Sequence, residues 1–271
     1  MAQPDWNSLI QQFDGSGVNA LVLMGSYARG DAGPFSDVDL LRLIGEETSD
    51  LTNNLTGEGS YLIDDRLVTL SNADPAQVDA WFTEPNLAVS VVASLRDAQV
   101  LVERENAFAK VKERADTFVW DEAMQTKANA YASQEMVGWI EEAHKGLEGL
   151  RRMDIEEINI EQEVIGRLLN ARFGLTHGLS HVVQVQHGIA TNSDNAFYAD
   201  VAEAVGLDSA WSRVRTVAFG VGLDGRTPTL REQVEAGLLL YVETAQLLRK
   251  AILPQHKPLI QRTVERINDY W

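Results

Sequence analysis

The spacing of apolar residues changes near the middle of the chain. Up to about residue 115, short apolar runs alternate with turn residues, which is typical of strands and short helices joined by loops. From about Trp120 onward, apolar residues recur every three or four positions, which is typical of amphipathic helices. The pattern predicts an α+β protein in which a mixed-sheet domain at residues 1–117 is followed by an all-α helical bundle domain at residues 118–271.

Short apolar runs predict the strands of the first domain. They lie at residues 20–24, 38–44, 60–64, 67–71 and 87–95. Because the third and fourth of these runs flank Asp65-Arg66, they are expected to form a hairpin. A short helix is expected at residues 75–82, since Asp74 suits the N-cap position and Pro75 the first helical position.

Long stripes of apolar residues at helical spacing predict the second domain. The stripes run through Met136, Ile140, Ala143, Leu147 and Leu150, through Ile160, Val164, Leu168, Ala171 and Leu175, and through Val234, Leu238, Tyr241, Ala245, Leu248 and Ile252. Polar breaks at residues 153–154, 188–194 and 223–228 separate these helices, so the expected arrangement is an antiparallel bundle.

Charge and composition narrow the classes of partner. The 271 residues include 40 Asp or Glu against 23 Lys or Arg, and the formal net charge is -17. Nucleic-acid backbones are bound through Lys and Arg, so this balance argues against a nucleic-acid partner and favours small-molecule or cationic partners. The chain has no cysteine, which excludes a thiol nucleophile and a cysteine-ligated metal. Since neither a signal-peptide pattern nor a membrane-length apolar run is found, the expectation is a soluble cytoplasmic protein without a membrane partner.

One stretch combines features that suit phosphate and metal chemistry. A predicted strand runs into Gly25-Ser26, and the next predicted strand carries Asp37 and Asp39 about ten residues later. A Gly-Ser turn lets backbone N–H groups approach a phosphate closely, and a following helix start adds positive partial charge. Alternation along a strand places Asp37 and Asp39 on one face, and their hard oxygens suit Mg²⁺ together with phosphate oxygens. These parts are those that phosphoryl or nucleotidyl transfer needs.

At these residues the sequence resembles the polymerase β-like nucleotidyltransferase superfamily, so the mixed-sheet domain is expected to be of nucleotidyltransferase type. The resemblance is closest to the kanamycin-type aminoglycoside nucleotidyltransferases, which also carry Gly-Ser, an arginine at the position of Arg29, and a Gly-Pro-aromatic sequence before Ser36-Asp37. It implies that Gly25 and Ser26 grip the triphosphate of ATP or another nucleotide. It also implies that Asp37 and Asp39 hold Mg²⁺ and that Arg29 neutralises phosphate charge.

The sequence departs from the superfamily at a third acid, which often stands on a later strand. Its place would fall near Val68, which is apolar. Asp64 and Asp65 are close in sequence, but they are expected to form the hairpin turn. The departure leaves open which group deprotonates the acceptor and whether the protein is active.

A pair of residues in the helical half offers a base. Glu141 and Lys145 are four apart on one helix face, and Glu141 lies at the border of the apolar stripe, where burial would raise its pKa. Kanamycin-type enzymes carry Glu-x-x-x-Lys at about this place. The resemblance implies that Glu141 is the general base for the acceptor hydroxyl and that Lys145 contacts the nucleotide phosphates, with Glu142 as the alternative base. An ordinary surface ion pair is the other interpretation.

Taken together, the sequence predicts a Mg²⁺-dependent enzyme with ATP or another nucleoside triphosphate as co-substrate. It would move a nucleoside monophosphate to a hydroxyl of a small molecule, and the expected group is AMP from ATP. The negative charge of the chain favours a cationic acceptor, such as an aminoglycoside-like compound. Two alternatives stay open, namely a non-catalytic nucleotide-binding regulatory protein and a protein-modifying nucleotidyltransferase. Formation of a homodimer is also left open.

Overall fold

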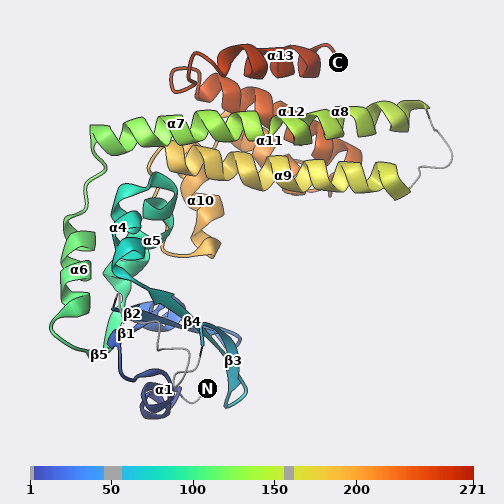
Figure 1. The fold of residues 1–271 in the computed structure, drawn as a ribbon. Helices are drawn as coiled ribbons and strands as arrows, with labels where there is room; N and C mark the ends of the chain where they lie inside the picture. Colours follow the sequence, from blue (N-terminus) through green and yellow to red (C-terminus); the bar gives the residue numbers. More distant parts are fainter. Residues whose placement is uncertain (1–2, 46–56, 156–161) are drawn as a thin grey trace. The chain divides into compact units, whose positions relative to one another are not determined.

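The fold is taken from a computed structural model, which describes residues 3–45, 57–155 and 162–271 (Figure 1). Helices and strands occupy the first part of the chain, and only helices follow from residue 122 onward in the part of the chain described. The α+β class expected from the sequence is confirmed. No helix in these ranges is long and apolar enough to span a membrane.

The chain divides into two compact units. The N-terminal unit runs to Asp121 and also includes Ala190–Phe197, which comes from much later in the sequence. The helical unit consists of Glu122–Ile189 and Tyr198–Trp271. The chain therefore leaves the helical unit once, contributes a short segment to the N-terminal unit, and returns.

The described residues of the N-terminal unit form one sheet of five strands. These are β1 (Val18–Met24), β2 (Val38–Ile44), β3 (Gly59–Ile63), β4 (Arg66–Ala73) and β5 (Gln99–Glu103). Their spatial order is β3-β4-β2-β1-β5. The pair β2–β4 is parallel, and the other neighbouring pairs are antiparallel. The end of β1, where the Gly-Ser turn begins, therefore lies beside the start of its antiparallel neighbour β2.

Apolar side chains at alternating positions of the strands lie on one face of the sheet, where they form a hydrophobic core. Helix α1 (Trp6–Phe13), capped by the side chain of Asp5, lays its apolar residues on this face. The buried residues of this core are Leu9, Phe13, Leu21, Leu23, Ala28, Val38, Leu40, Val68 and Leu70. Burial of such side chains stabilises the fold by roughly 1.5–3 kcal/mol each, so this core fixes the strand register on which the site depends.

The expected helix at 75–82 is confirmed, whereas the expected strand at 87–95 is wrong. Helix α4 (Pro75–Thr83) begins with a capping box between Asp74 and Gln77. Residues 87–95 lie inside helix α5 (Pro85–Asp97). A short apolar run does not by itself distinguish a strand from a buried helix, and here Pro85 supplies a backbone angle already suited to a first helical turn. The fifth strand of the sheet is instead β5, which the sequence pattern did not reveal.

The expected hairpin is confirmed, but its turn is shifted by one residue. Strands β3 and β4 pair as Ile63 with Arg66, which leaves Asp64 and Asp65 as the turn residues. Both have positive φ angles, 50° and 56°. Asp tolerates this left-handed region better than most residues, and two such residues make the turn that matches the twist of a hairpin. Arg66 belongs to β4 and not to the turn.

The remaining helices confirm the helical expectation for the second half. They are α7 (Glu122–Gly138), α8 (Ile140–Ile155), α9 (Gln162–Gln186), α10 (Asp194–Val205), α11 (Ala210–Ala218), α12 (Leu230–Leu247) and α13 (Lys257–Asn268), while α6 (Ala107–Thr117) belongs to the N-terminal unit. Helix α9 lies at the centre and contacts α7, α8, α11 and α12 (Figure 1). Residues 153–154, where a break between helices was expected, lie in the last turn of α8, which ends at Ile155. Ile160, from the second apolar stripe, lies outside the described residues.

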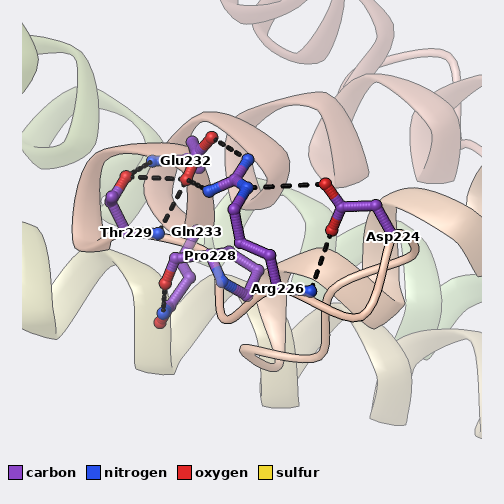
Figure 2. A network of polar contacts seen from close by, with 6 residues as sticks. All are labelled: Asp224, Arg226, Pro228, Thr229, Glu232 and Gln233. Carbon is purple, nitrogen blue, oxygen red and sulfur yellow. Dashed lines mark hydrogen bonds and ion pairs between the residues drawn. The ribbon is translucent and has the colours of Figure 1, made fainter.

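A polar network closes the loop before α12 (Figure 2). Arg226 forms an ion pair with Glu232 at 2.6 Å and with Asp224 at 3.4 Å. Thr229 and Glu232 form a capping box at the first turn of α12. The hydrogen bond from Arg226, followed by those from Thr229, lowers the pKa of Glu232 to about 2. The loop is therefore fixed by its own side chains, although most of them are exposed.

Candidate functional site

The Gly-Ser turn follows β1 directly. Residues Gly25–Arg29 form the short helix α2, which ends at Gly30 in the left-handed conformation. Gly25 itself has a φ of +64°, a value that favours glycine over residues with a side chain. Met24, the last residue of β1, pairs with Asp39 of β2. The turn therefore begins beside the second acid of the Asp-x-Asp motif.

The space around position 25 is also too small for any side chain. A Cβ atom at Gly25 would lie 2.1 Å from Oδ2 of Asp39, far inside van der Waals contact. The backbone of the turn thus closes directly on the Asp39 carboxylate. Two parts of the sequence motif that are 14 positions apart are in contact in the structure.

The surroundings of Asp39 disfavour its negative charge. Val38 and Leu40 point into the core with α1, and Asp39 lies on the opposite face of β2, where it is half-buried. Burial first, and then the charge of Asp37, raise the pKa of Asp39 to about 6, while Arg29 acts in the opposite direction. Within the described ranges, neither carboxylate of the pair takes part in a side-chain hydrogen bond or ion pair. Two crowded carboxylates without a bonded cation are what a divalent ion would stabilise.

The donor set fits Mg²⁺ together with a nucleotide. In the described part of the chain, no group of three or more acidic or histidine residues is arranged to hold a metal ion by itself. Mg²⁺ is commonly bound by one or two carboxylates, with phosphate oxygens and waters completing its shell. Asp37 and Asp39 beside the Gly25 turn are of the chemical type that could form the protein share of such a shell.

Strand β4 lies beside β2 but offers no acid there. Thr69 pairs with Asp39 in the parallel register, so its side chain lies on the same face. Val68, where the third acid was expected to be missing, pairs with Val38 and is buried in the α1 core. Asp64 and Asp65 occupy the hairpin turn, as expected. Thr69 therefore stands at the position nearest to Asp39 on this strand.

Arg29 is engaged by the chain itself. Its Nη1 donates to the backbone oxygen of Asn192 at 2.8 Å, and its Nη2 lies 3.3 Å from Asp31. The side chain is only 16% exposed. Sequence analysis placed Arg29 near the phosphates but gave no indication of Asn192, because the two residues are 163 positions apart.

The acids on α8 differ from the sequence expectation. Lys145 Nζ lies 2.8 Å from a carboxylate oxygen of Glu141 and 2.8 Å from one of Glu142. The Glu141 side chain is 75% exposed, and its hydrogen bond with Lys145 lowers its pKa. The expectation that burial raises the pKa of Glu141 is therefore wrong: α8 turns this residue toward solvent.

Glu142 has the partly buried position that was expected of Glu141. Its side chain is 20% exposed, and its Oε2 is buried without a hydrogen-bond partner among the described residues. The neighbouring Trp139 has a buried Nε1 in the same condition. Both side chains pack on α9 at Gly174, where a Cβ would lie 3.1 Å from each. A carboxylate with a buried and unsatisfied oxygen is a candidate proton acceptor.

Comparison with known proteins found one family model that matches part of the first unit. Residues 7–102 match the family model described as a nucleotidyltransferase domain, a range that holds the Gly-Ser turn, the Asp pair and nearly the whole sheet. The match supports the nucleotidyltransferase superfamily and nucleotidyl transfer in general. It does not extend to the helical unit.

The chain also matches several solved structures. One of them is a nucleotidyltransferase-like protein from Exiguobacterium sibiricum 255-15, at 14% sequence identity and a TM-score of 0.46. The alignment covers 91% of this chain and 74% of the other. No curated protein matches the sequence significantly.

Proposed function

We propose that the protein is a Mg²⁺-dependent nucleotidyltransferase that moves AMP from ATP to a hydroxyl of a small molecule and releases pyrophosphate. The observation that carries the proposal is the closure of the Gly25 turn on Asp39, with Asp37 beside it, inside a matched nucleotidyltransferase domain. In this proposal, the backbone of the turn binds the phosphates and the adjacent pair of carboxylates binds the metal ion. Both parts are needed at once for transfer of a nucleotidyl group.

For the N-terminal unit we propose the roles that the resemblance implies, which the positions of the residues support. The backbone of Gly25 and Ser26 binds the triphosphate, and Asp37 and Asp39 hold Mg²⁺. When bound, the ion supplies positive charge that offsets the charge developing on the leaving pyrophosphate. Arg29 adds positive charge at the end of α2.

The proposed base lies on α8. The resemblance to kanamycin-type enzymes implies Glu141, and the burial of Glu142 favours its neighbour for the same role. A base must accept the hydroxyl proton, and both glutamates pair with Lys145 through one oxygen. Glu142 differs in that its second carboxylate oxygen is buried without a hydrogen-bond partner among the described residues, whereas the Glu141 side chain is mostly exposed. We therefore assign the base to Glu142, with Lys145 orienting it and contacting the phosphates.

The proposed acceptor is a small, hydroxylated and cationic compound of aminoglycoside-like type. Support comes from the net charge of -17, which attracts cations and repels polyanions such as RNA.

A screen of pyrophosphate release tests the proposal. Purified protein is incubated with Mg²⁺ and each of ATP, GTP, CTP and UTP, against aminoglycosides, lincosamides, neutral sugars, short RNAs and no acceptor. The expected result is release that requires ATP, Mg²⁺ and a cationic sugar. Release with RNA alone, or labelling of the protein itself by radioactive ATP, would contradict the small-molecule acceptor.

One observation favours a second candidate function. Thr69 stands beside Asp39 where a third acid could assist transfer, so the domain could bind a nucleotide without transferring it. The two candidates are distinguished by calorimetry and turnover together. Tight binding of MgATP without pyrophosphate release from any acceptor would favour the non-catalytic protein.

A further inference from the structure

The segment Ala190–Phe197 has an unusual place in the chain. The helices on both sides of it, α9 and most of α10, belong to the helical unit, yet the segment itself belongs to the N-terminal unit. It lies outside the residues that match the nucleotidyltransferase domain, 7–102. It is therefore an addition to that domain, contributed from almost 90 residues later in the sequence.

Three hydrogen bonds hold two consecutive residues of this segment. The backbone N–H of Thr191 donates to the Val89 carbonyl of α5 at 3.0 Å. The side-chain amide of Asn192 donates to Asp97, at the end of α5, at 3.0 Å. The backbone oxygen of Asn192 accepts the bond from Arg29 at 2.8 Å. Donors and acceptors from α2 and α5 thus fix the segment on both sides.

Arg29 links this segment to the nucleotide-binding turn. It is the last residue of the five-residue helix α2, whose first residue is Gly25. The nucleotide-binding turn and Asn192 are therefore linked through the single turn of α2 and the Arg29 side chain. If the turn moved when a triphosphate bound, Arg29 would carry that movement to Asn192. The bond from a guanidinium to a main-chain oxygen is charge-assisted, and such bonds are stronger than neutral ones.

We propose that residues 190–197 form part of the nucleotide site, with Arg29 as the positioning residue that anchors them beside the nucleotide-binding turn. The inference rests on the proposed function for the identity of the ligand. It gives Arg29 a role that differs from direct contact with phosphate. It also couples occupation of the turn to a segment that continues into α9 and α10.

Hydrogen exchange of the nucleotide-free protein tests the anchor. Arg29→Ala is expected to speed exchange of the peptide that covers residues 190–197 by about tenfold, because it removes one charged hydrogen bond. Arg213→Ala is the matched control, since Arg213 also donates from Nη1 to a main-chain oxygen at 2.8 Å, that of Asp208. Unchanged exchange of the peptide in Arg29→Ala would overturn the proposal.

Binding of MgATP to three variants tests whether the segment serves the site. Asn192→Ala and Asp97→Ala disturb the segment without altering Arg29 or the Asp pair, and both are expected to weaken MgATP binding several-fold. If only Arg29→Ala weakens binding, Arg29 is a phosphate ligand and the proposal is wrong.

The two arms separate this inference from the proposed function. A wild-type protein that binds no MgATP contradicts the proposed function and, with it, the role of the segment in a nucleotide site. Binding with normal turnover but no effect of the segment variants contradicts only the present inference.

Discussion

At the scale of single residues, the site depends on the fit between Gly25 and Asp39. The backbone of the turn occupies the space that a side chain at Gly25 would need, so Asp39 is held close to the position proposed for the phosphates. The same closeness and burial make the charge of Asp39 unfavourable in the absence of a cation. A residue with these properties stabilises a ligand complex at the expense of the free fold.

Asp39→Asn is expected to abolish Mg²⁺-dependent transfer and to stabilise the free protein at pH 7. The pKa of Asp39 is raised from 3.8 to about 6, so the folded state binds the proton more tightly than the unfolded state. Stability from this group is thus full below about pH 4 and is lost as the pH rises through about 6. Removing the charge should raise the free energy of unfolding at pH 7 by about 1 kcal/mol, after allowance for solvent screening, and by less at pH 5.

Urea denaturation at both pH values measures this effect, with Asp208→Asn, an exposed site, as the control. A variant that retains wild-type transfer would refute the metal assignment. A variant that is less stable at pH 7 would show instead that the Asp39 carboxylate supports the fold.

Glu142 and Glu141 form a matched pair for the assignment of the base. Both bond the same lysine, and they differ in burial. Glu142→Gln should lower kcat by about 100-fold or more with little change in nucleotide affinity, as expected for a general base. Glu141→Gln should change kcat by less than about threefold, because an exposed ion pair contributes little. Single-turnover kinetics measures the rate of the chemical step in both variants. A larger loss of rate in Glu141→Gln than in Glu142→Gln would assign the base to Glu141.

At the scale of secondary-structure elements, local signals decided some elements and not others. The cap at Asp74 defined α4, and the alternation of Val38, Asp39 and Leu40 defined β2. The run at 87–95 is different, because nearly all of its residues are apolar and both periods fit it. As a helix it buries Ala88, Val89, Val92 and Leu95, which recur at helical spacing.

Thr229→Ala tests the contribution of one cap to the helical unit. Thr229 accepts from the backbone of Glu232, and the Glu232 side chain accepts from the backbone of Thr229. Loss of such a cap costs about 1 kcal/mol, which should lower the melting temperature by a few degrees. Thr227→Ala, an exposed neighbour in the same loop, should leave the melting temperature unchanged in calorimetry. Equal effects of the two variants would show that the capping box does not stabilise α12.

At the scale of the whole molecule, charge and chain path are the main features. The net charge of -17 belongs to the chain as a whole, whereas the path that takes residues 190–197 into the N-terminal unit belongs to the fold. The net charge acts on ligands over long distances, and its effect weakens as salt is added. The path of residues 190–197 affects the N-terminal unit only through direct contacts.

Long-range attraction predicts a salt dependence for the acceptor. For a cationic acceptor, kcat/KM should fall several-fold between about 20 mM and 200 mM salt, because screening weakens the attraction to an acidic protein. For a neutral sugar of similar size it should stay constant. Steady-state kinetics at constant MgATP measures both, and equal salt dependence would contradict steering by the protein.

The sequence by itself determined the class of fold, most of the helices and the pairing of the Gly-Ser turn with the Asp-x-Asp motif. These features are encoded locally, in alternation, in helical spacing and in the special backbone freedom of Gly25. Only the tertiary structure decided that residues 87–95 are helical, that Glu142 and not Glu141 is shielded from solvent, and that Arg29 holds Asn192. The physical reason is that burial and hydrogen bonding depend on partners far away in the chain, and neither spacing nor composition specifies which partner arrives.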